Sequence, residues 1–417
     1  MTVGSIMAGR PEAPVRRYTR GQSVFRLVLV VAALVAAGFA SWSVLLFVVL
    51  FAVSIIAHEF GHYLVARRTG MKVTEFFIGF GPRIWSVRRG ETEYGVKAIP
   101  LGAYVKTPGM TGMEADIPPE DEPRTFRAQA SWKRALMIFA GPSMNLLLAL
   151  VGFCVAFSVF DEPTITSRFP SIEVADTPGD PVSPAVRSGL RTGDVIRSID
   201  GIAIDPKGAY TQVGDIVRSR PDRAVPIVVE RNGALLTIAA TLGTRPGCSS
   251  LGYLGVRPQA AIGSISRNPI EGVGAGVQYF GSAAGQTVSG MAKLFGPAGL
   301  GRIFKSVTHS ACDDVTSRPM SIIGISQIGG QAVRSGAQAT IMLISVVNLA
   351  LGLLNLMPVL PLDGGHLLMT GIERWRRRRR PGYVIDYAKA LPYFSVAIVL
   401  LAFVMLSALY LDTIRLF

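Results

Sequence analysis

Long apolar stretches, separated by polar segments, dominate the pattern of this chain. The first extends from Leu27 to about Leu64 and is interrupted only by GFASWS at 38–43. As a single helix it would be roughly 55 Å long, nearly twice the thickness of the hydrocarbon core of a bilayer. We therefore expect a break within this interruption, which separates a short apolar segment, 25–40, from a complete first core span over 43–66.

Three further stretches are apolar over about 20 residues or more, which is enough to cross a membrane. They cover 135–160, 337–366 and 388–411. The sequence therefore predicts a polytopic α-helical membrane protein with about four core spans, including or in addition to the N-terminal segment. The composition, 49% hydrophobic and 17% charged, agrees with a membrane protein and argues against a soluble one.

The basic N-terminus and its apolar segment, residues 1–41, allow two interpretations. Arginines precede the segment, and the AGFA that ends it supplies the small residues of a signal-peptidase site. The segment is either a cleaved signal or an additional short span, and we favour the uncleaved span. In both cases Ser41 lies outside, and the first core span runs inwards.

The net charge is +14, and many of the arginines that contribute to it lie next to the apolar stretches, as in ARRTGMK at 66–72 and ERWRRRRRPG at 373–382. They lack the interleaved aromatic residues of a basic stripe that binds nucleic acid, so we expect no nucleic-acid partner. By the positive-inside rule these loops, together with the loop 107–134, are cytoplasmic. Residues 161–335 then lie outside, in a multi-pass protein of the cell membrane.

Ionisable side chains at the end of the first core span give the strongest chemical signal. The motif HEFGH places His58 and His62 four residues apart, so both imidazoles lie on one helix face and can reach one metal ion. Glu59 can then act as a general base on water at that ion. The alternative is a motif at the water interface, satisfied by solvent. Ionisable groups within spans are rare unless they face a polar cavity and have a function, which favours the metal site.

Asp363 is the expected third ligand, because catalytic zinc takes three protein ligands and leaves one position open. It follows LLNLMPVLPL at 353–362, at the cytoplasmic end of the third core span, at a depth that matches the motif's histidines. The prolines of this segment should unwind the helix just before it. A helix cap is the alternative role for Asp363. The other two histidines, His309 and His366, are not expected to bind metal.

HEFGH on the first core span, together with NLMPVLPLDG at 355–364, resembles the bacterial site-2 proteases, which are intramembrane zinc metalloproteases. The stretch from GMKVTEFF to LGAYV at 70–105 is similar above all to the actinobacterial members of Rip type. The resemblance covers about residues 43–410. It implies that His58, His62 and Asp363 bind Zn2+ and that Glu59 is catalytic.

The same resemblance implies a membrane-reentrant β-hairpin over 70–106, whose alternating pattern and glycines suit strands that could pair with an extended substrate. Ala103 stands where a glycine is commoner in the family. Asn355 matches an asparagine placed near the scissile peptide, although an interhelical hydrogen bond would also explain it. The residues assigned to substrate binding are Asn355, Gly79, Gly81 and Gly102.

SPAVRSGLRTGDVIRSIDGIAI at 183–204 predicts a helix, a turn, a strand, a second turn and a further strand, and resembles PDZ domains. We expect an inserted extracytoplasmic α/β PDZ domain over 165–260. Its groove would bind a peptide or chain segment by strand addition, or the domain would exclude substrates whose external part is still folded. Residues 263–335 are expected to form a linker with an amphipathic helix on the outer membrane surface.

Cysteines give little further information. Cys248 and Cys312 both fall in the external region, where they form one disulfide or remain free thiols. Cys154 lies in an apolar stretch and is expected to pack as a small apolar residue.

The resemblance implies hydrolysis of a peptide bond in the transmembrane segment of single-span proteins that have already been clipped outside, with anti-sigma factors as the expected substrates. The alternative is a membrane-anchored PDZ scaffold or adaptor with a non-catalytic metal site. The presence of Glu59 beside all three expected ligands argues against this alternative. A metal transporter would need polar residues through several spans, and the other apolar stretches lack them.

Overall fold

The structure is a computed structural model, and it divides the chain into two compact units. One comprises Met1–Ala149 and Ser326–Ile398, and the other comprises Leu150–Ile325 and Val399–Phe417. The segment 25–40, His309 and Cys312 lie outside the described residues. These described residues are 41–110, 117–165, 171–174, 183–205, 209–245, 248–259, 262–308, 321–380, 383 and 387–414.

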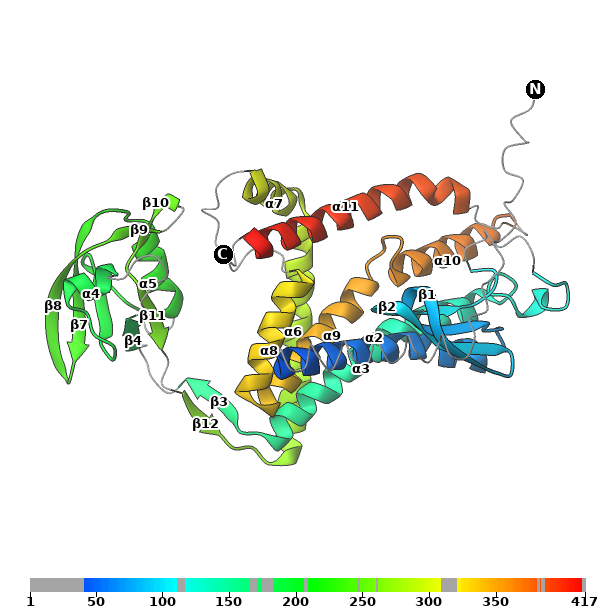
Figure 1. Ribbon diagram of the computed structural model, residues 1–417, viewed down its shortest axis with the longest axis horizontal. Coiled ribbons are helices and arrows are strands. Elements are labelled where there is room, and N and C mark those ends of the chain that lie inside the picture. The colour runs from blue at the N-terminus through cyan, green and yellow to red at the C-terminus, as the bar shows by residue number, and fades with distance from the viewer. Residues whose placement is uncertain are drawn as a thin grey trace, which may run out of the picture. The chain divides into compact units, whose positions relative to one another are not determined.

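Four helices are long and apolar enough to span a membrane among the residues that the structure describes (Figure 1). Their outward positions carry large exposed side chains such as Val53 and Val151, as expected of surfaces that face lipid. The prediction of about four core spans is therefore confirmed. The helices are α2 (Trp42–Arg68), α3 (Ser131–Val159), α9 (Ala337–Asn355) and α11 (Tyr387–Ile414), the last of which contributes Pro392–Thr413 as its span.

The third span is shorter than predicted. Helix α9 ends at Asn355, and a new helix, α10 (Asp363–Arg377), begins after an irregular segment, 356–362. Pro358 and Pro361 lack the N–H that would continue the helix. The prediction that prolines unwind the chain before Asp363 is thus confirmed, but the expected helix up to residue 366 is wrong. Asn355 and Asp363 therefore belong to different helices.

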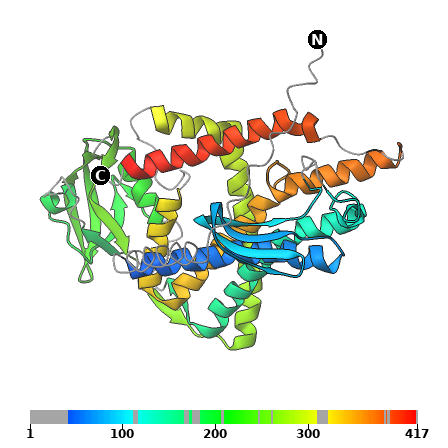
Figure 2. The same cartoon turned by 45° about the vertical axis from the view of Figure 1, so that its right-hand side comes forward.

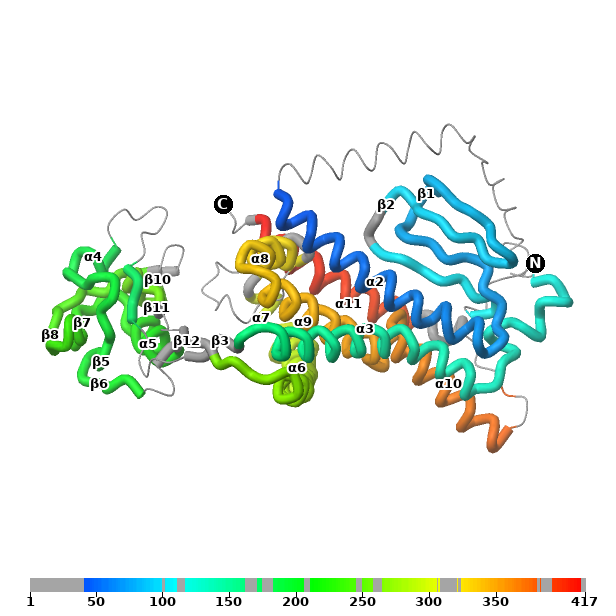
Figure 3. Tube along the Cα trace, turned by 90° about the horizontal axis from the view of Figure 1, so that it is seen from below, coloured from blue at the N-terminus to red at the C-terminus, as the bar shows by residue number. Residues whose placement is uncertain are grey.

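Residues 75–106 form a strongly curved hairpin of β1 (Glu75–Arg89) and β2 (Thr92–Lys106), drawn in light blue in Figure 2. Its first segment, 75–78, pairs on one side with 93–96 and on the other side with 103–106. Strand β2 lies against α2 (Figure 3).

Glycines make the curvature of the hairpin feasible. Gly79, Gly81 and Gly102 have φ angles of 87°, 82° and 136°, which side-chain-bearing residues rarely adopt. A Cβ atom on Gly79 would also lie 2.6 Å from the carbonyl oxygen of Ile99. Their special backbone geometry is therefore a requirement of the fold, whatever further role they have.

A β-rich region in the second unit covers most of the predicted PDZ domain. Its main sheet has the order β11-β4-β5-β7-β8, with β6 paired to β5, around a core that includes Ile199, Ile227 and Val229. The predicted order over 183–204 is observed as α4, a turn, β5, a turn and β6. The elements are β4 (Ser171–Val174), α4 (Pro184–Ser188), β5 (Val195–Ile199), β6 (Ile202–Ala203), α5 (Ala209–Arg218), β7 (Ala224–Arg231), β8 (Ala234–Thr241) and β11 (Val256–Gln259).

One ion pair fixes the turn before β5. The Arg231 guanidinium lies 2.7 Å from Asp194 Oδ1 and 2.8 Å from its Oδ2, and the backbone N–H of Arg191 also donates to this carboxylate. The hydrogen bonds from Arg231 hold the pKa of Asp194 below its ordinary value, although its burial acts in the opposite direction. This contribution to stability is present above the ordinary pKa of an aspartate and is lost as the pH falls through the lowered value.

Helix α6 (Pro269–Phe295) packs along the last turns of α3. A Cβ atom on Gly272 or Gly276 would lie within 2.6 Å of the α3 backbone, so these small residues permit a close approach. The Tyr279 ring contacts Phe153 and Phe157. The expectation that this region lies on the outer membrane surface stays a prediction. The remaining elements of the described chain are η2 (Glu122–Arg124), β3 (Glu162–Ile165), β9 (Gly243–Arg245), β10 (Cys248–Tyr253), β12 (Ile262–Ile265), α7 (Pro297–Thr308) and α8 (Ile322–Ser335).

A buried ion pair joins α3 to α10. Arg134 donates to both carboxylate oxygens of Glu373, at 3.2 and 2.9 Å, and both side chains are less than 5% exposed. Removing one partner leaves the other charge buried and uncompensated, which costs about 3–5 kcal/mol. We expect Glu373→Ala to lower the melting temperature of the detergent-purified protein by several degrees. Asp215→Ala, which breaks the exposed pair with Arg218, should change it little, and equal shifts would contradict this account.

Candidate metal centre

The two histidines of the HEFGH motif lie on one face of α2, one helical turn apart. His58 and His62 are 8% and 6% exposed, and their Nε2 atoms are 3.2 Å apart. These nitrogens can form one hydrogen bond with each other, or both can turn their lone pairs to a third group.

Asp363 provides that third group. It is the first residue of α10, and its Oδ2 lies 3.1 Å from His58 Nε2 and 3.3 Å from His62 Nε2. Among the described residues these three side chains form the one cluster of three or more histidines, cysteines or acids that could hold a metal ion. The structure therefore brings together the residues that the sequence analysis selected as ligands.

The chemistry of this cluster fits zinc. Zinc–ligand bonds of about 2.0–2.1 Å in a tetrahedral arrangement place the ligand atoms about 3.3 Å apart, close to the three observed separations. His62 Nδ1 lies 2.8 Å from the Met137 carbonyl oxygen, so Nδ1–H donates and Nε2 keeps its lone pair. No other donor reaches the buried Asp363 Oδ2 within the described part of the chain. Converging lone pairs of two nitrogens and one oxygen favour a bound cation.

The backbone of α3 covers the histidine pair at Gly141. A Cβ atom on this residue would lie 2.2 Å from His62 Nε2 and 2.8 Å from His58 Nε2. On the adjoining turn of α2, Gly61 makes a similar approach to the Ala140 carbonyl oxygen. The GPSMN sequence at 141–145 thus begins with a residue that must lack a side chain.

We expect Gly141→Ala to displace the imidazoles and to reduce the zinc content of the protein by tenfold or more. The added methyl group has only imidazole atoms or the α3 backbone to displace. Metal analysis of the purified protein would measure the effect. Gly371→Ala on α10, where a Cβ would meet nothing within 4 Å, is the matched control. A Gly141→Ala protein with full zinc content would contradict the expectation.

Glu59 adjoins both the histidine pair and the hairpin. Its carboxylate lies close enough to His58, His62 and Asp363, and to the backbone of Val105 in β2, to interact with them electrostatically. A carboxylate in this position can accept a proton from water bound at the cluster.

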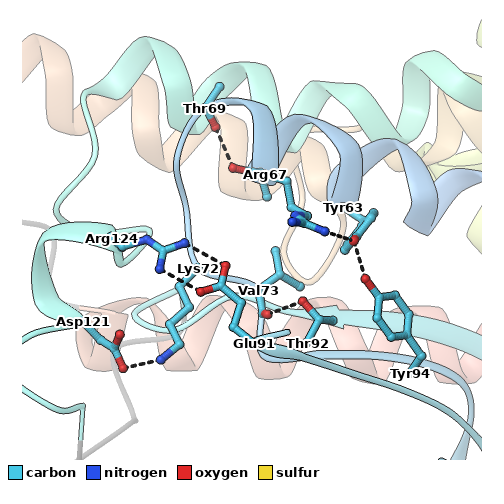
Figure 4. Close-up of polar contacts among 11 residues, drawn as sticks. Tyr63, Arg67, Thr69, Lys72, Val73, Glu91, Thr92, Tyr94, Asp121 and Arg124 are labelled. Atoms are coloured by element: carbon cyan, nitrogen blue, oxygen red, sulfur yellow. Dashed lines mark hydrogen bonds and ion pairs between the residues drawn. The ribbon is translucent and has the colours of Figure 1, made fainter. Parts of the chain in front are cut away.

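Polar contacts that the sequence analysis missed hold the hairpin against α2 (Figure 4). The Tyr63 hydroxyl, one residue after His62, forms a short hydrogen bond with the Tyr94 hydroxyl of β2. Arg67 donates to the Tyr63 hydroxyl at 2.8 Å. Tyr63 alone suggests an aromatic packing residue, and nothing in the sequence links it to Tyr94.

The turn of the hairpin has a second anchor. Arg124 forms two hydrogen bonds of 2.7 Å with the Glu91 carboxylate, and Thr92 donates to the Val73 carbonyl oxygen at 2.7 Å. Lys72 pairs with Asp121 nearby. The loop 107–134, predicted to be cytoplasmic, therefore fixes the hairpin at one end through Asp121 and Arg124.

The remaining predicted substrate residues have separate positions. Asn355 is the half-buried last residue of α9, and the segment 356–362 separates it from Asp363. Gly79, Gly81 and Gly102 lie at the bends of the hairpin. Their roles toward substrate stay predictions.

Comparison with known proteins identifies similar sequences over most of the chain. The model of peptidase family M50 matches residues 46–402. The zinc metalloprotease Rip1 of Mycobacterium tuberculosis is 34% identical over 409 residues, which cover 89% of this chain and 97% of that protein. Rip1 of Mycolicibacterium smegmatis is 31% identical over 405 residues, with the same two shares. A putative zinc metalloprotease of Rhizobium meliloti is 31% identical over 352 residues, covering 80% of this chain and 87% of that protein.

Proposed function

Because the chain belongs to peptidase family M50 and is an intramembrane zinc metalloprotease, we propose that His58, His62 and Asp363 hold its zinc ion and that Glu59 is its general base. The observation that carries this assignment is the convergence of the three ligand atoms within 3.3 Å of one another, beside the Glu59 carboxylate. The bound ion supplies a Lewis acid and a water of lowered pKa.

Residues of the protein itself transfer the proton, orient a ligand and limit the access of water. Glu59 accepts the proton of the attacking water and later delivers it to the nitrogen of the leaving amine. The Met137 carbonyl oxygen keeps His62 in the tautomer whose Nε2 faces the site. The apolar surroundings of the four candidate spans limit the access of bulk water.

A substrate helix must unwind before hydrolysis, because its backbone groups are already hydrogen-bonded within the helix. The segment 103–106 of β2 pairs with 75–78 on one side, and no strand of the described residues pairs with its other side. An unwound peptide that added to this free edge would lie next to Val105, whose backbone contacts Glu59. The hairpin therefore provides a template that presents an extended chain to the catalytic group.

The substrates that we propose are single-span membrane proteins already clipped on the outside, with anti-sigma factors as the first candidates. The similarity to Rip1 proteins supports this class. The site would lie near the cytoplasmic face, because Arg67 and Arg68 follow the motif directly and a run of arginines follows α10. The β-rich region would be an extracytoplasmic PDZ domain that binds a chain segment or excludes folded substrates.

The test reconstitutes the purified protein in a bilayer with a candidate single-span anti-sigma factor whose external part has been removed. We expect cleavage within the transmembrane segment, loss of cleavage on zinc chelation and recovery on addition of Zn2+. A substrate whose external domain is intact and folded should be cut more slowly. Binding of the same proteins without any metal-dependent cleavage would instead indicate a scaffold.

A further inference from the structure

The C-terminal half of α10 and the residues that follow it form an arginine cluster, defined as Arg374 and Arg376–Arg380. All members except the half-buried Arg377 are exposed. Glu373, the one acid next to them in sequence, is buried and engaged by Arg134 and Arg377. No carboxylate of the described residues pairs with Arg374, Arg378 or Arg380. The cluster therefore presents several guanidinium groups with unmatched charge.

Neighbouring aromatic groups order this cluster. The Arg379 guanidinium lies 4.9 Å from the centre of the Trp375 ring, which is 53% exposed. Arg376 donates to the Tyr383 hydroxyl at 2.7 Å, and Arg377 donates to the Tyr383 carbonyl oxygen at 2.8 Å. An exposed tryptophan among ordered arginines is typical of the membrane interface, where the ring lies at the level of the headgroups.

An apolar pocket opens beside the N-terminal half of the same helix. It has a volume of about 270 Å³ and is lined by residues 358–360 of the loop, by Leu368 and Met369 of α10 and by Tyr393 of α11. Leu368 and Tyr393 are 46% and 78% exposed, so the pocket is accessible from outside. Apart from the Tyr393 hydroxyl, its lining side chains are apolar and suit a hydrocarbon chain.

Trp375, which lies among the arginines of the cluster, is on the same face of α10 as Leu368 of the pocket. Leu368 and Trp375 are seven residues apart, which is two helical turns and about 10 Å along the axis. This separation fits one phospholipid, with its phosphate at the guanidinium groups and the first part of an acyl chain at Leu368. We propose that this face of α10 binds an anionic phospholipid. Arginine recognises phosphate oxygens through paired N–H donors, and basic clusters next to spans attract anionic headgroups.

This site would regulate proteolysis, a step that rests on the proposed role of Asp363 as a zinc ligand. The wall of the pocket, 358–360, belongs to the loop that leads directly to Asp363. A Cβ atom on Gly365 would lie 2.5 Å from the Leu360 nitrogen, so this loop packs closely on the first turn of α10. Glu373 fixes the other end of the helix to α3. An acyl chain in the pocket would therefore hold the loop and Asp363 in their assembled position.

The binding test uses the full-length Glu59→Gln protein, so that turnover plays no part. Native mass spectrometry would compare the retention of phosphatidylglycerol and phosphatidylcholine after extraction from mixed nanodiscs. We expect a preference for phosphatidylglycerol of about tenfold or more, from two or three arginines near the surface. Arg374→Gln/Arg378→Gln/Arg380→Gln should reduce the preference to about twofold. A triple Arg→Lys variant, which keeps the charge and the positive-inside signal, should retain most of it.

Exposed arginines of the β-rich region provide the matched control. Arg187→Gln/Arg191→Gln/Arg223→Gln removes the same charge elsewhere and should leave the preference unchanged. Leu368→Trp, which fills the pocket, should weaken the retention of long-chain but not of short-chain phosphatidylglycerol. An equal loss of the phosphatidylglycerol preference in both triple Gln variants would overturn the proposal. Complete displacement of the lipid by inorganic phosphate at millimolar concentration would also overturn it, because the site would then recognise only the phosphate.

A cleavage assay in nanodiscs of different lipid composition distinguishes this lipid-binding proposal from the proposed proteolytic function. Wild-type protein should cleave a single-span substrate severalfold faster in nanodiscs that contain phosphatidylglycerol than in pure phosphatidylcholine, and the triple Gln variant should lose this difference. Specific lipid retention without any Glu59-dependent cleavage would refute the proposed function alone. Cleavage that is indifferent to lipid charge, together with equal retention of both lipids, would refute the lipid site alone.

Discussion

Glu59→Gln should reduce the rate of peptide-bond cleavage by about a thousandfold, because general acid–base catalysis contributes roughly 10²–10⁴. The substituted amide keeps the size of the side chain and one polar oxygen, but it cannot take a proton from water. The zinc content and the melting temperature should stay close to those of the wild type, since Glu59 is not among the three converging ligands. Single-turnover cleavage of a bilayer-embedded substrate, with metal analysis of the same sample, measures both quantities.

Glu91→Gln is the matched control for this substitution. Glu91 lies at the turn of the hairpin and pairs with Arg124, so its replacement changes an ion pair without touching the cluster. Its cleavage rate should remain within a few-fold of the wild type. Wild-type turnover in the Glu59→Gln protein would remove Glu59 from the mechanism, and loss of zinc from that protein would make it a ligand instead of a base.

Asp363→Asn should produce the second large effect, a loss of zinc. A change to a partner of a metal ligand already costs 10–100-fold in metal affinity, so we expect more than about a hundredfold for the ligand itself. The neutral amide oxygen also leaves the two buried imidazoles without the negative charge that faces them at 3.1 and 3.3 Å. Zinc per mole of purified protein and competition with a chelator of known affinity measure the change. Excess Zn2+ should restore part of the proteolysis.

Asp121→Asn tests whether any nearby aspartate would give the same result. Asp121, in the loop 107–134, pairs with Lys72 and is not among the three ligands. Its substitution should leave the zinc content and the chelator competition unchanged. Full zinc occupancy in the Asp363→Asn protein would mean that the third ligand is a different residue.

The sequence contained the main elements of the fold because hydrophobic length is a local property. Four spans follow from apolar stretches of sufficient length, and the HEFGH spacing places two imidazoles on one helix face. Asp363 could be selected because the depth of a residue in a span depends only on counting along the chain. The structure brings this residue to the histidines from a helix that begins about 300 residues later in the sequence.

Features that depend on tertiary geometry could not be predicted. The prolines indicate that the third span breaks, but the end of α9 at Asn355 depends on how Gly364 and Gly365 pack against the loop. Arg134 and Glu373 lie in segments whose charge suggests solvent exposure, yet they are buried together. The double pairing of 75–78 requires a register change that no alternating pattern encodes.

The close approach of the Val105 backbone to the Glu59 carboxylate would keep the catalytic group engaged until a substrate arrives. A peptide that adds to the edge of β2 needs the backbone groups of that strand for its own pairing. Its arrival would draw the Val105 amide away from the carboxylate and leave the latter free to accept a proton. Intact helices in the surrounding lipid, whose backbone groups are already satisfied, would pass without triggering this exchange. Discrimination between substrates and other membrane proteins would then depend on how readily their transmembrane helices unwind.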